Sequence, residues 1–397
     1  MEKKGKLDSL TGLRFFAALA IFYIHLVNFI PTSEFLQSAF AKAFLPACSA
    51  GVCLFFLLSG FILAYTHVDL SLTSSSLYKF WTSRIARIYP VYFLALILYS
   101  PFILAHRFSV EPTAIAINKT IASLLPSLFL IQSWGHPRFA IAWNGPGWSL
   151  SVEAALYLVF PWMTYCLAKL SQRLLLWTIG ALLLLSFGLS TVVPRLFASW
   201  PYAELFVNFN PIFHLPTFGI GIALGCHFLR SKVEHRKTEW LAVWGGVSIG
   251  VLALVAPKVS PLIAHNSLFV LPFAVLIYGL ARGGKLSGFF AIPFFVLLGE
   301  ASYSFYILQF PLGSTFRWLN EGRPTTDLVA ALPGSGVFSG IGAAVACLVL
   351  LVGMSIIIYR SFEVPLRRRF LGYLQRGLGK APPSRLPLPP VGVNGAR

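Results

Sequence analysis

The chain has 397 residues, of which 57% are hydrophobic and only 11% are charged. A soluble domain carries about 25% charged residues, so this composition excludes a disordered chain, a collagen, a coiled coil and an ordinary soluble enzyme. The formal net charge is +18, but the basic residues stand in short clusters between long apolar runs. That pattern is typical of loops that face the cytoplasm. We therefore expect a membrane protein with many spans, with the lipid bilayer as a partner and no nucleic acid.

A helix needs about 20 apolar residues to cross a bilayer, and runs of about this length without charge recur along the chain. In order, they cover 15–33, 43–68, 88–106, 174–194, 205–229, 240–257, 259–281 and 328–359. Two further spans each hold one acid, from about 148 to 168 around Glu153 and from about 290 to 313 around Glu300. The pattern predicts an all-α, polytopic membrane helix bundle with about ten transmembrane helices.

The basic clusters between these runs orient the bundle, because positive residues prefer the cytoplasmic side of a membrane. They are Lys3/Lys4/Lys6, Lys79/Arg84/Arg87, Lys169/Arg173, Arg230/Lys232/Arg236/Lys237, Arg282/Lys285 and Arg360/Arg367/Arg368/Arg369. Ten crossings place all of these clusters inside and make both termini cytoplasmic. An eleventh apolar run, at 120–137, would break this arrangement if it crossed, so we expect it to be re-entrant or interfacial.

Residues 77–88 mix aromatic and basic side chains. They predict a short amphipathic helix on the inner surface, which leads through Pro90 into the next span. We expect one membrane domain over 1–379, with its core at about 7–360, followed by a disordered, Pro-rich cytoplasmic tail over 380–397. The first span has a long apolar run and no suitable cleavage site, so it is not interpreted as a signal peptide.

Glycine patterns within the apolar runs predict close helix packing. Gly221/Gly225 and Gly336/Gly340 are G-x-x-x-G pairs, which permit two helix backbones to approach each other. The match of 246–250 to G-x-S-x-G lies inside an apolar helix and lacks the strand–turn–helix context of a nucleophile elbow. Neither the histidines nor the cysteines show metal-ligand spacing, so we predict no metal site.

Arg14 and His25 are ionisable residues inside the first span. They are 11 residues apart, about three helical turns, so both face the same side at a separation of roughly 16 Å along the axis. Ionisable groups within a bilayer are costly and usually functional, and histidine can act as a general base near neutral pH. The alternative is a histidine bonded to a backbone carbonyl within the bundle.

Arg84 and Arg87 form an R-x-x-R motif on one face of a helix. Two guanidinium groups held together suit phosphate binding. The alternative is a positive-inside anchor, whose side chains reach the lipid headgroups. From these two residues alone the anchor is the favoured interpretation.

The stretch WNGPGWSLSVEAALYLVFP gathers aromatic, hydroxyl and acidic residues where an outer loop enters a span. Ser149, Glu153 and Tyr157 are spaced by four and share a helix face. Together with the rings of Trp143 and Trp148, a carboxylate at this depth would suit a sugar. An aromatic belt at the membrane interface also accounts for the tryptophans.

Five blocks of the sequence resemble the acyltransferase family 3 membrane proteins, and they occur in the family's order. Each block is weak by itself, but together they are specific. They are LDSLTGLRFFAALAIFYIHL (7–26), LFFLLSGFIL (54–63), FWTSRIARIYPVYF (80–93), WSLSVEAALYLVFP (148–161) and LGEASYSFYILQFPL (298–312).

The resemblance implies a bundle of ten core helices that moves acyl groups, often acetyl, from cytoplasmic acyl-CoA to hydroxyl groups of carbohydrate or glycosylated acceptors. It implies that His25 is essential to transfer, with Arg14 as the arginine before it. It also implies that Arg84 and Arg87 serve the acyl-CoA donor, and that Glu153 is the acid of the W-S-L-x-x-E block.

The block at 298–312 departs from the family. Gln309 stands where many members have histidine, and glutamine can form hydrogen bonds but cannot titrate. We therefore assign it no catalytic role. Glu300, at the start of the same block, is explained about as well by a polar contact between helices as by a site.

The sequence thus predicts a membrane O-acyltransferase of a bacterial inner (cytoplasmic) membrane. Its donor substrate is expected to be acyl-CoA, with acetyl-CoA as the first candidate, and no bound cofactor is expected. The predicted catalytic residues are His25 and Glu153. The predicted donor-binding residues are Arg14, Arg84 and Arg87, and the predicted acceptor-binding residues are Trp143, Trp148, Ser149 and Tyr157.

Two other classes of function remain open from the sequence. A transporter or flippase for a lipid-linked sugar also uses intramembrane histidine, arginine and glutamate, although no paired inverted segments are visible. A non-catalytic assembly partner in polysaccharide synthesis is the third possibility. The sequence does not indicate the acceptor or the oligomeric state.

Overall fold

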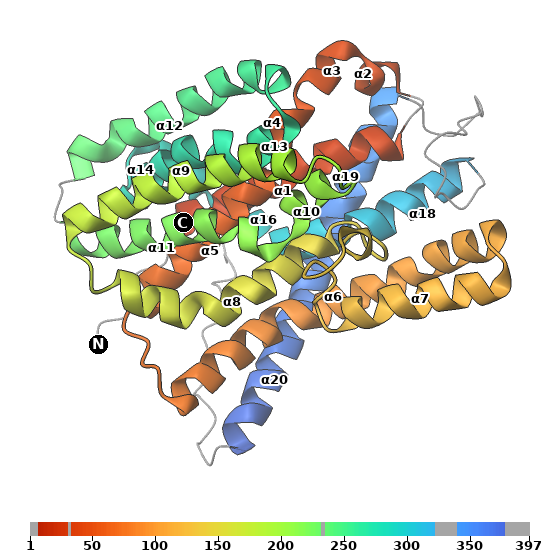
Figure 1. The fold of residues 1–397 in the computed structure, drawn as a ribbon, viewed down its shortest axis with the longest axis horizontal. Coiled ribbons are helices and arrows are strands. Elements are labelled where there is room, and N and C mark those ends of the chain that lie inside the picture. Colours follow the sequence, from red (N-terminus) through yellow and green to blue (C-terminus); the bar gives the residue numbers. More distant parts are fainter. Residues whose placement is uncertain (1–6, 31–32, 232–234, 322–339, 378–397) are drawn as a thin grey trace, which may run out of the picture.

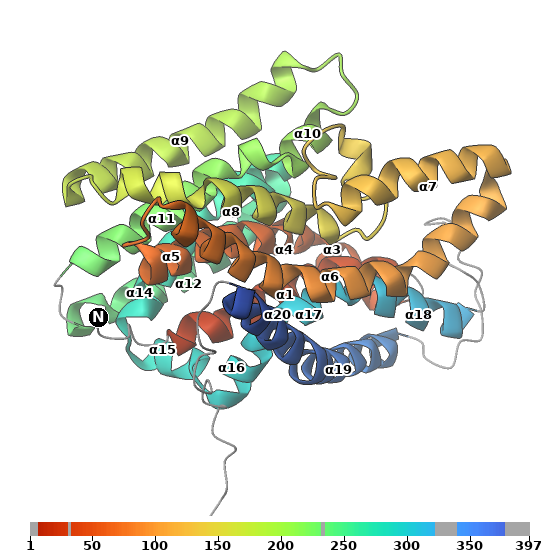
Figure 2. The same ribbon diagram turned by 90° about the horizontal axis from the view of Figure 1, so that it is seen from below.

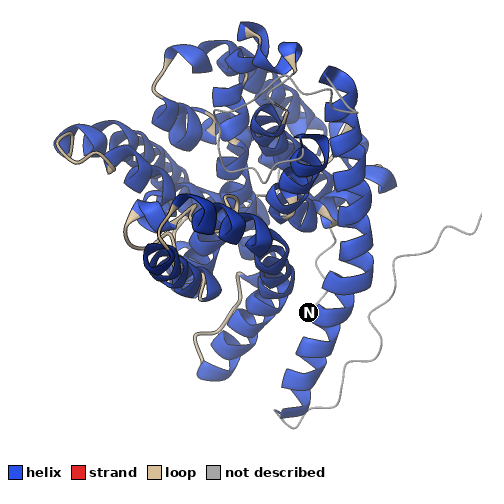
Figure 3. Ribbon diagram, turned by 90° about the vertical axis from the view of Figure 1, so that its right-hand side faces the viewer, coloured by secondary structure: helices blue, strands red, loops and turns tan. Residues whose placement is uncertain are grey.

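The computed structural model describes residues 7–30, 33–231, 235–321 and 340–377. Within these ranges it consists of helices and connecting segments, without a strand (Figure 3). Eight helices of the described part are long and apolar enough to cross a membrane, which confirms the predicted all-α, polytopic helix bundle. They cover Asp8–Phe29, Leu45–His67, Ser74–Val110, Gly147–Leu167, Gln172–Leu196, Trp240–Lys258, Pro261–Arg282 and Gly342–Tyr373. The predicted disordered tail, 380–397, lies outside the described residues.

The helices follow one another in the order shown in Figure 1. The first half of the chain holds α1 (Asp8–Phe29), α2 (Glu34–Gln37), α3 (Ala39–Ala43), α4 (Leu45–Ser49), α5 (Gly51–His67), α6 (Ser74–Val110), α7 (Thr113–Leu128), η1 (Pro137–Phe139), α8 (Gly147–Leu167) and α9 (Gln172–Leu196). The second half holds α10 (Ala203–Phe209), η2 (Pro211–Phe213), α11 (Leu215–Arg230), α12 (His235–Val255), η3 (Ala256–Lys258), α13 (Pro261–Ile263), η4 (Ala264–Leu268), α14 (Val270–Arg282), α15 (Lys285–Phe290), α16 (Pro293–Glu300), α17 (Ser302–Ile307), α18 (Gln309–Glu321), α19 (Gly340–Ile358), η5 (Tyr359–Glu363) and α20 (Val364–Gly377).

Two of the expected crossings consist of shorter helices. The segment 205–229 breaks at Asn210, whose backbone is extended because the next residue is a proline. There α10, η2 and α11 replace a single helix. The segment 290–313 contains α16, α17 and α18, which meet at turns centred on Ala301 and Leu308. Irregular backbone at membrane depth is tolerated where protein surrounds it or where it borders a cavity.

The long helix α6 differs from the prediction at its start. It is continuous through Pro90 and Pro101, so residues 77–88 are helical and lead through Pro90 as predicted, but they belong to one helix of 37 residues instead of a short one. The position of 77–88 at the inner membrane surface stays a prediction. Packing of neighbouring helices makes such prolines tolerable in membrane helices. After α6 the chain turns back into α7, which lies beside it (Figure 1). Because α7 is too short to be a candidate span, the re-entrant or interfacial character of 120–137 stays a prediction.

Helices α5 and α11 pack through glycine. A Cβ atom at Gly221 would lie 2.2 Å from the carbonyl oxygen of Leu57, and one at Gly225 would lie 2.8 Å from that of Phe61. A larger residue would push the helices apart, so the predicted close packing at this glycine pair is confirmed. The second predicted pair includes Gly336, which lies outside the described residues.

Helix α1 runs at the centre of the bundle and packs against α16, α17 and α18 in turn (Figure 2). A Cβ atom at Gly299 would lie 1.8 Å from the carbonyl oxygen of Thr11, so α16 and α1 are in backbone contact. Farther along α1, the ring of Phe305 contacts those of Phe15 and Phe22, with centroids 5.7 and 5.6 Å away. These contacts place the short helices α17 and α18 directly alongside α1.

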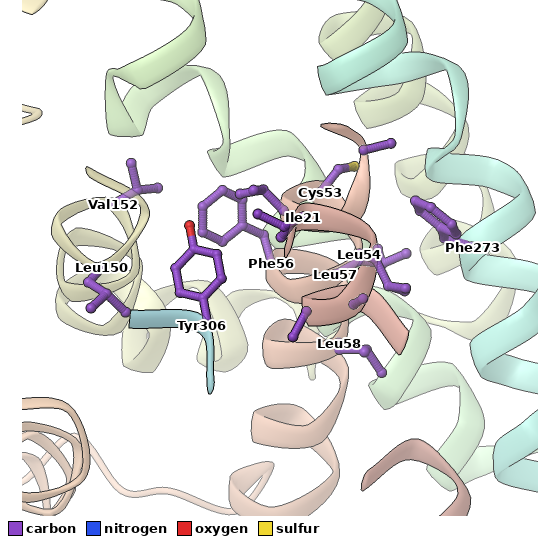
Figure 4. Close-up of a cluster of buried hydrophobic side chains, with 14 of the residues drawn as sticks. Ile21, Cys53, Leu54, Phe56, Leu57, Leu58, Leu150, Val152, Phe273 and Tyr306 are labelled. Carbon is purple, nitrogen blue, oxygen red and sulfur yellow. The ribbon is translucent and has the colours of Figure 1, made fainter. Parts of the chain in front are cut away.

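One part of the apolar core lies between α1, α5, α8 and α17. Figure 4 shows Tyr306 between α5 and α8, next to Phe56 and Leu150. Leu57 is fully buried in the same region. At the far end of the chain, α19 continues through η5 into α20, which lies beside the first part of α6 (Figure 1).

Candidate active site

Helices that are far apart in sequence surround one cavity that is partly open to the surface. It lies between α1, α5, α6, α8 and α17. Its polar lining residues are Arg14, Ser59, Arg84, Arg87, Ser149, Glu153, Tyr157, Ser302, Tyr303 and Tyr306. Its apolar lining residues are Val52, Phe55, Phe56, Leu58, Ile62, Leu63 and Leu150. One wall is therefore polar and strongly basic, and the wall formed by α5 is largely apolar.

Three arginines enter the cavity from two helices. Arg14 comes from α1, whereas Arg84 and Arg87 come from adjacent turns of α6. The Arg84 guanidinium lies 5.7 Å from the ring centroid of Phe80 and 6.0 Å from that of Tyr157. Within the described ranges, none of the three arginines forms an ion pair with a carboxylate. Guanidinium groups gathered in this way favour a ligand with several anionic groups.

Helix α8 presents its predicted polar face to the same cavity. Ser149, Glu153 and Tyr157 all line it, as their spacing of four residues predicts. The Tyr157 hydroxyl donates a hydrogen bond to the Glu153 carboxylate. The Ser149 Oγ lies 2.7 Å from the hydroxyl of Tyr306, so one of the two hydroxyls donates to the other. Both also lie within hydrogen-bond distance of the carbonyl oxygen of Pro146, at 3.0 and 3.2 Å. Glu153 is the one acidic residue among those that line the cavity.

His25 does not line this cavity. Its Nδ1 lies 2.5 Å from Oε1 of Gln309, and the edge of its ring packs against Phe310 with the centroids 4.9 Å apart. Arg14 and His25 thus reach different surroundings, although they were predicted to face one side of the span. Gln309 follows the lining residue Tyr306 by three positions in the chain. The His25–Gln309 pair therefore lies near the part of the cavity that α17 lines.

The two tryptophans of the predicted acceptor group are buried in protein. The indole N–H of Trp143 donates to the carbonyl oxygen of Leu96 at 3.2 Å. The ring of Trp148 packs against those of His214 and His265, with centroids 5.7 and 5.9 Å away. Neither tryptophan lines the cavity, whereas the other two members of the predicted group do. Contact of the tryptophans with an acceptor stays a prediction.

Several lining residues were not predicted. Tyr303 and Tyr306 belong to the 298–312 block, but their sequence positions alone gave no reason to place them beside the arginines. Ser59 lies in an apolar run and carries no distinguishing pattern. Tyr303 also donates a hydrogen bond to the carbonyl oxygen of Ile88, which ties α17 to the helix that carries two of the arginines.

Two acids next to α17 have different surroundings. Glu300 accepts a hydrogen bond from the hydroxyl of Tyr359 at 3.1 Å, which is a polar contact between helices. Glu363 is 4% exposed and accepts a hydrogen bond from Ser304 at 2.7 Å. Its electrostatic neighbours include Arg87. No pattern in the sequence indicated that Glu363 lies near the arginines.

The fold is that of a multi-pass membrane protein, and the cavity within its helix bundle is lined by three arginines. The chain matches the family model described as an acyltransferase domain over residues 7–360. The chain therefore belongs to acyltransferase family 3, and it is a membrane acyltransferase. This result favours the enzyme over the transporter and the assembly partner.

Two relatives are similar over most of the chain. Acyltransferase MdmB of Streptomyces mycarofaciens is 31% identical over 326 residues, which cover 77% of this chain and 78% of that protein. O-acetyltransferase OatA of Staphylococcus aureus is 23% identical over 327 residues, which cover 77% of this chain and 50% of that protein. No solved structure matches the chain.

Proposed function

We propose that this protein transfers an acyl group, with acetyl as the first candidate, from acyl-CoA to a hydroxyl group of a carbohydrate or glycosylated acceptor. The observation that carries the proposal is the cavity in which Arg14, Arg84 and Arg87 meet without a carboxylate ion pair among the described residues. Coenzyme A carries several phosphate groups, and guanidinium forks bind phosphate in a bidentate manner. The name of the similar O-acetyltransferase OatA supports acetyl as the group transferred.

The apolar α5 wall gives the rest of the donor a place to lie. Val52, Phe55 and Leu58 face the same space as the arginines, so the pantetheine arm and the acyl group would run along them. Tyr306 stands where this wall meets α17, three residues before the partner of His25. In this arrangement the thioester approaches His25 by passing Tyr306.

The transfer step requires one base. The acceptor oxygen attacks the thioester carbonyl carbon, His25 takes the hydroxyl proton, and the carbon–sulfur bond breaks as the carbon–oxygen bond forms. The proton on His25 then passes to the departing CoA thiolate. Glu153 lines the cavity together with the three arginines, whereas His25 does not line it, so we propose that Glu153 orients the donor through Tyr157.

We further propose that the protein lies in a bacterial inner membrane with both termini cytoplasmic. The basic clusters between the spans support this orientation, because it places Arg84 and Arg87 toward the side that holds acyl-CoA. The acceptor then arrives from the opposite side, where we place the loop that carries Trp143 and the start of α8, which carries Trp148.

Donor binding tests this proposal directly. Acetyl-CoA is titrated calorimetrically into the purified protein in nanodiscs, for the wild type, Arg84→Ala/Arg87→Ala and Arg173→Ala. Each lost charged hydrogen bond removes about 1.5–3 kcal/mol, so the double variant should bind at least about 100-fold more weakly. Arg173 is exposed and does not line the cavity, so its variant should bind like the wild type.

The same preparations are assayed for release of the CoA thiol. Wild-type affinity in the double variant would overturn the assignment of the cavity to the donor. Failure of the folded wild type to bind any acyl-CoA would overturn the proposed donor class as a whole.

A further inference from the structure

We propose that Gln309 is a positioning residue that holds His25 in one tautomer, with the proton on Nδ1 and the lone pair on Nε2. Nε2 is then the atom that accepts the proton of the acceptor hydroxyl. The proposal rests on the proposed role of His25 as the base, and it assigns a function to a glutamine that cannot titrate itself.

The orientation of the Gln309 amide follows from its second contact. Its nitrogen, Nε2, lies 3.3 Å from the carbonyl oxygen of Ala18, and a carbonyl oxygen only accepts hydrogen bonds. The amide nitrogen must therefore face Ala18, which directs the amide oxygen toward His25.

The tautomer of His25 follows from that orientation. The amide oxygen of Gln309 only accepts hydrogen bonds, and it lies 2.5 Å from Nδ1 of His25. Nδ1 must therefore carry the proton and donate it. In a neutral imidazole the other nitrogen then holds the lone pair.

The surroundings hold both side chains in place. Gln309 is 1% exposed, so loss of either hydrogen bond would leave a buried polar group unsatisfied. The rings of Phe310 and Phe29 lie 4.9 and 6.3 Å from the His25 ring, centroid to centroid, and 5.5 Å from each other. Among the described residues, Nε2 of His25 makes no hydrogen bond to a protein atom, which leaves it available to substrate.

In many functional histidines, the hydrogen-bond partner of one ring nitrogen determines which nitrogen carries the proton, and so which one can accept a proton. We assign Gln309 this role toward His25. A carboxylate partner would also stabilise the protonated ring, whereas the neutral amide of Gln309 only orients it. Replacing Gln309 by glutamate should therefore add a charge effect, and replacing it by leucine should remove the orientation.

The first test measures the tautomer of His25 directly. The full-length protein is labelled with ¹⁵N-histidine and placed in nanodiscs, and His25→Ala identifies the His25 signals. We expect wild-type shifts of a protonated Nδ1 and an unprotonated Nε2 at neutral pH. Gln309→Leu should shift these signals toward a mixture of tautomers. A wild-type ring protonated on Nε2 would overturn the proposal.

The second test measures the rate of acyl transfer from acetyl-CoA to water, which is followed by the release of the CoA thiol. Gln309→Leu should lower kcat by at least about 10-fold and leave KM for acetyl-CoA unchanged. Gln309→Glu should move the acidic limb of the pH–rate profile to higher pH, because a carboxylate favours the protonated ring. A glutamate variant with a wild-type profile contradicts the proposal.

Gln37→Leu is the matched control. Gln37 also donates its amide to a backbone carbonyl of α1, that of Val27 at 3.0 Å, but it has no contact with His25. Its variant should keep the wild-type profile and tautomer. Loss of acetyl-CoA binding in Gln309→Leu would show a merely structural role and overturn the proposal. Full activity in His25→Ala would instead overturn the proposed function on which it rests.

Discussion

Glu153 has an unusual electrostatic position, because it lines a cavity with three arginines and yet pairs with none of them within the described residues. Its hydrogen-bond partner is the Tyr157 hydroxyl. A single carboxylate among three cations lowers the positive potential that a phosphate would experience. At the scale of the residue, we therefore expect the Glu153 carboxylate to weaken donor binding while it helps to orient the donor for transfer.

Glu153→Gln tests that opposition. Removal of one negative charge should tighten acetyl-CoA binding by a few-fold, while loss of the carboxylate that orders Tyr157 should slow transfer. Calorimetry and thiol release on the same preparation measure the two effects separately. Glu204→Gln, on α10 outside the cavity lining, is the control. Weaker donor binding in Glu153→Gln would contradict the electrostatic argument.

At the scale of the element, the α5–α11 pair supports the apolar wall of the cavity. At Gly221, α11 packs closely against α5, and α5 supplies Phe55 and Ser59 to the lining. Helix α9, in contrast, carries Gly180, where a Cβ atom would have no neighbour within 4 Å. A methyl group added at Gly221 would therefore clash with the backbone of α5, whereas one added at Gly180 would contact no protein atom within 4 Å.

Gly221→Ala and Gly180→Ala form a matched pair. The first places a methyl group 2.2 Å from a carbonyl oxygen, and overpacking of this kind destabilises by about 1–3 kcal/mol. The second adds a methyl group in open space and should be neutral or stabilising, since alanine favours helix over glycine by about 1 kcal/mol. Thermal unfolding of each variant in the same detergent measures the difference. Equal melting temperatures would contradict the proposed close contact.

At the scale of the whole molecule, the apolar surface indicates where lipid lies. Helix α9 exposes Trp177 and Leu184 at 77% and 76%, and only 17% of its most apolar window is buried within the protein. Large apolar side chains at such exposure are expected to face the bilayer. The basic clusters then decide which end of each helix faces the cytoplasm.

Cysteine labelling in intact cells tests the orientation of the full chain. Thr113→Cys, at the start of α7, should react with a membrane-impermeant maleimide added outside the inner membrane. Ser75→Cys, at the start of α6, should react only after the membrane is permeabilised, because the neighbouring arginines hold that end inside. Both positions are exposed, and the wild type reports labelling of its own cysteines. The reverse pattern would place both termini outside.

The sequence alone determined the features that depend on local physics. A bilayer requires each span to satisfy its own backbone hydrogen bonds, so apolar runs between charges predicted the helices, including those that the structure builds in pieces. Helical periodicity alone placed Ser149, Glu153 and Tyr157 on one face. The five blocks between 7 and 312 were sufficient to predict the family that the comparison over 7–360 then showed.

Only the tertiary structure decided which of these residues meet. His25 and Gln309 are separated by 284 positions in the chain, and no periodicity connects residues so far apart. The meeting of Arg14 with Arg84 and Arg87, and the placement of Trp143 in a packed contact, likewise depend on how α1, α6, α8 and α17 pack. Helix packing is set by the combined fit of many side chains and small residues, so it cannot be read from the period of any single segment.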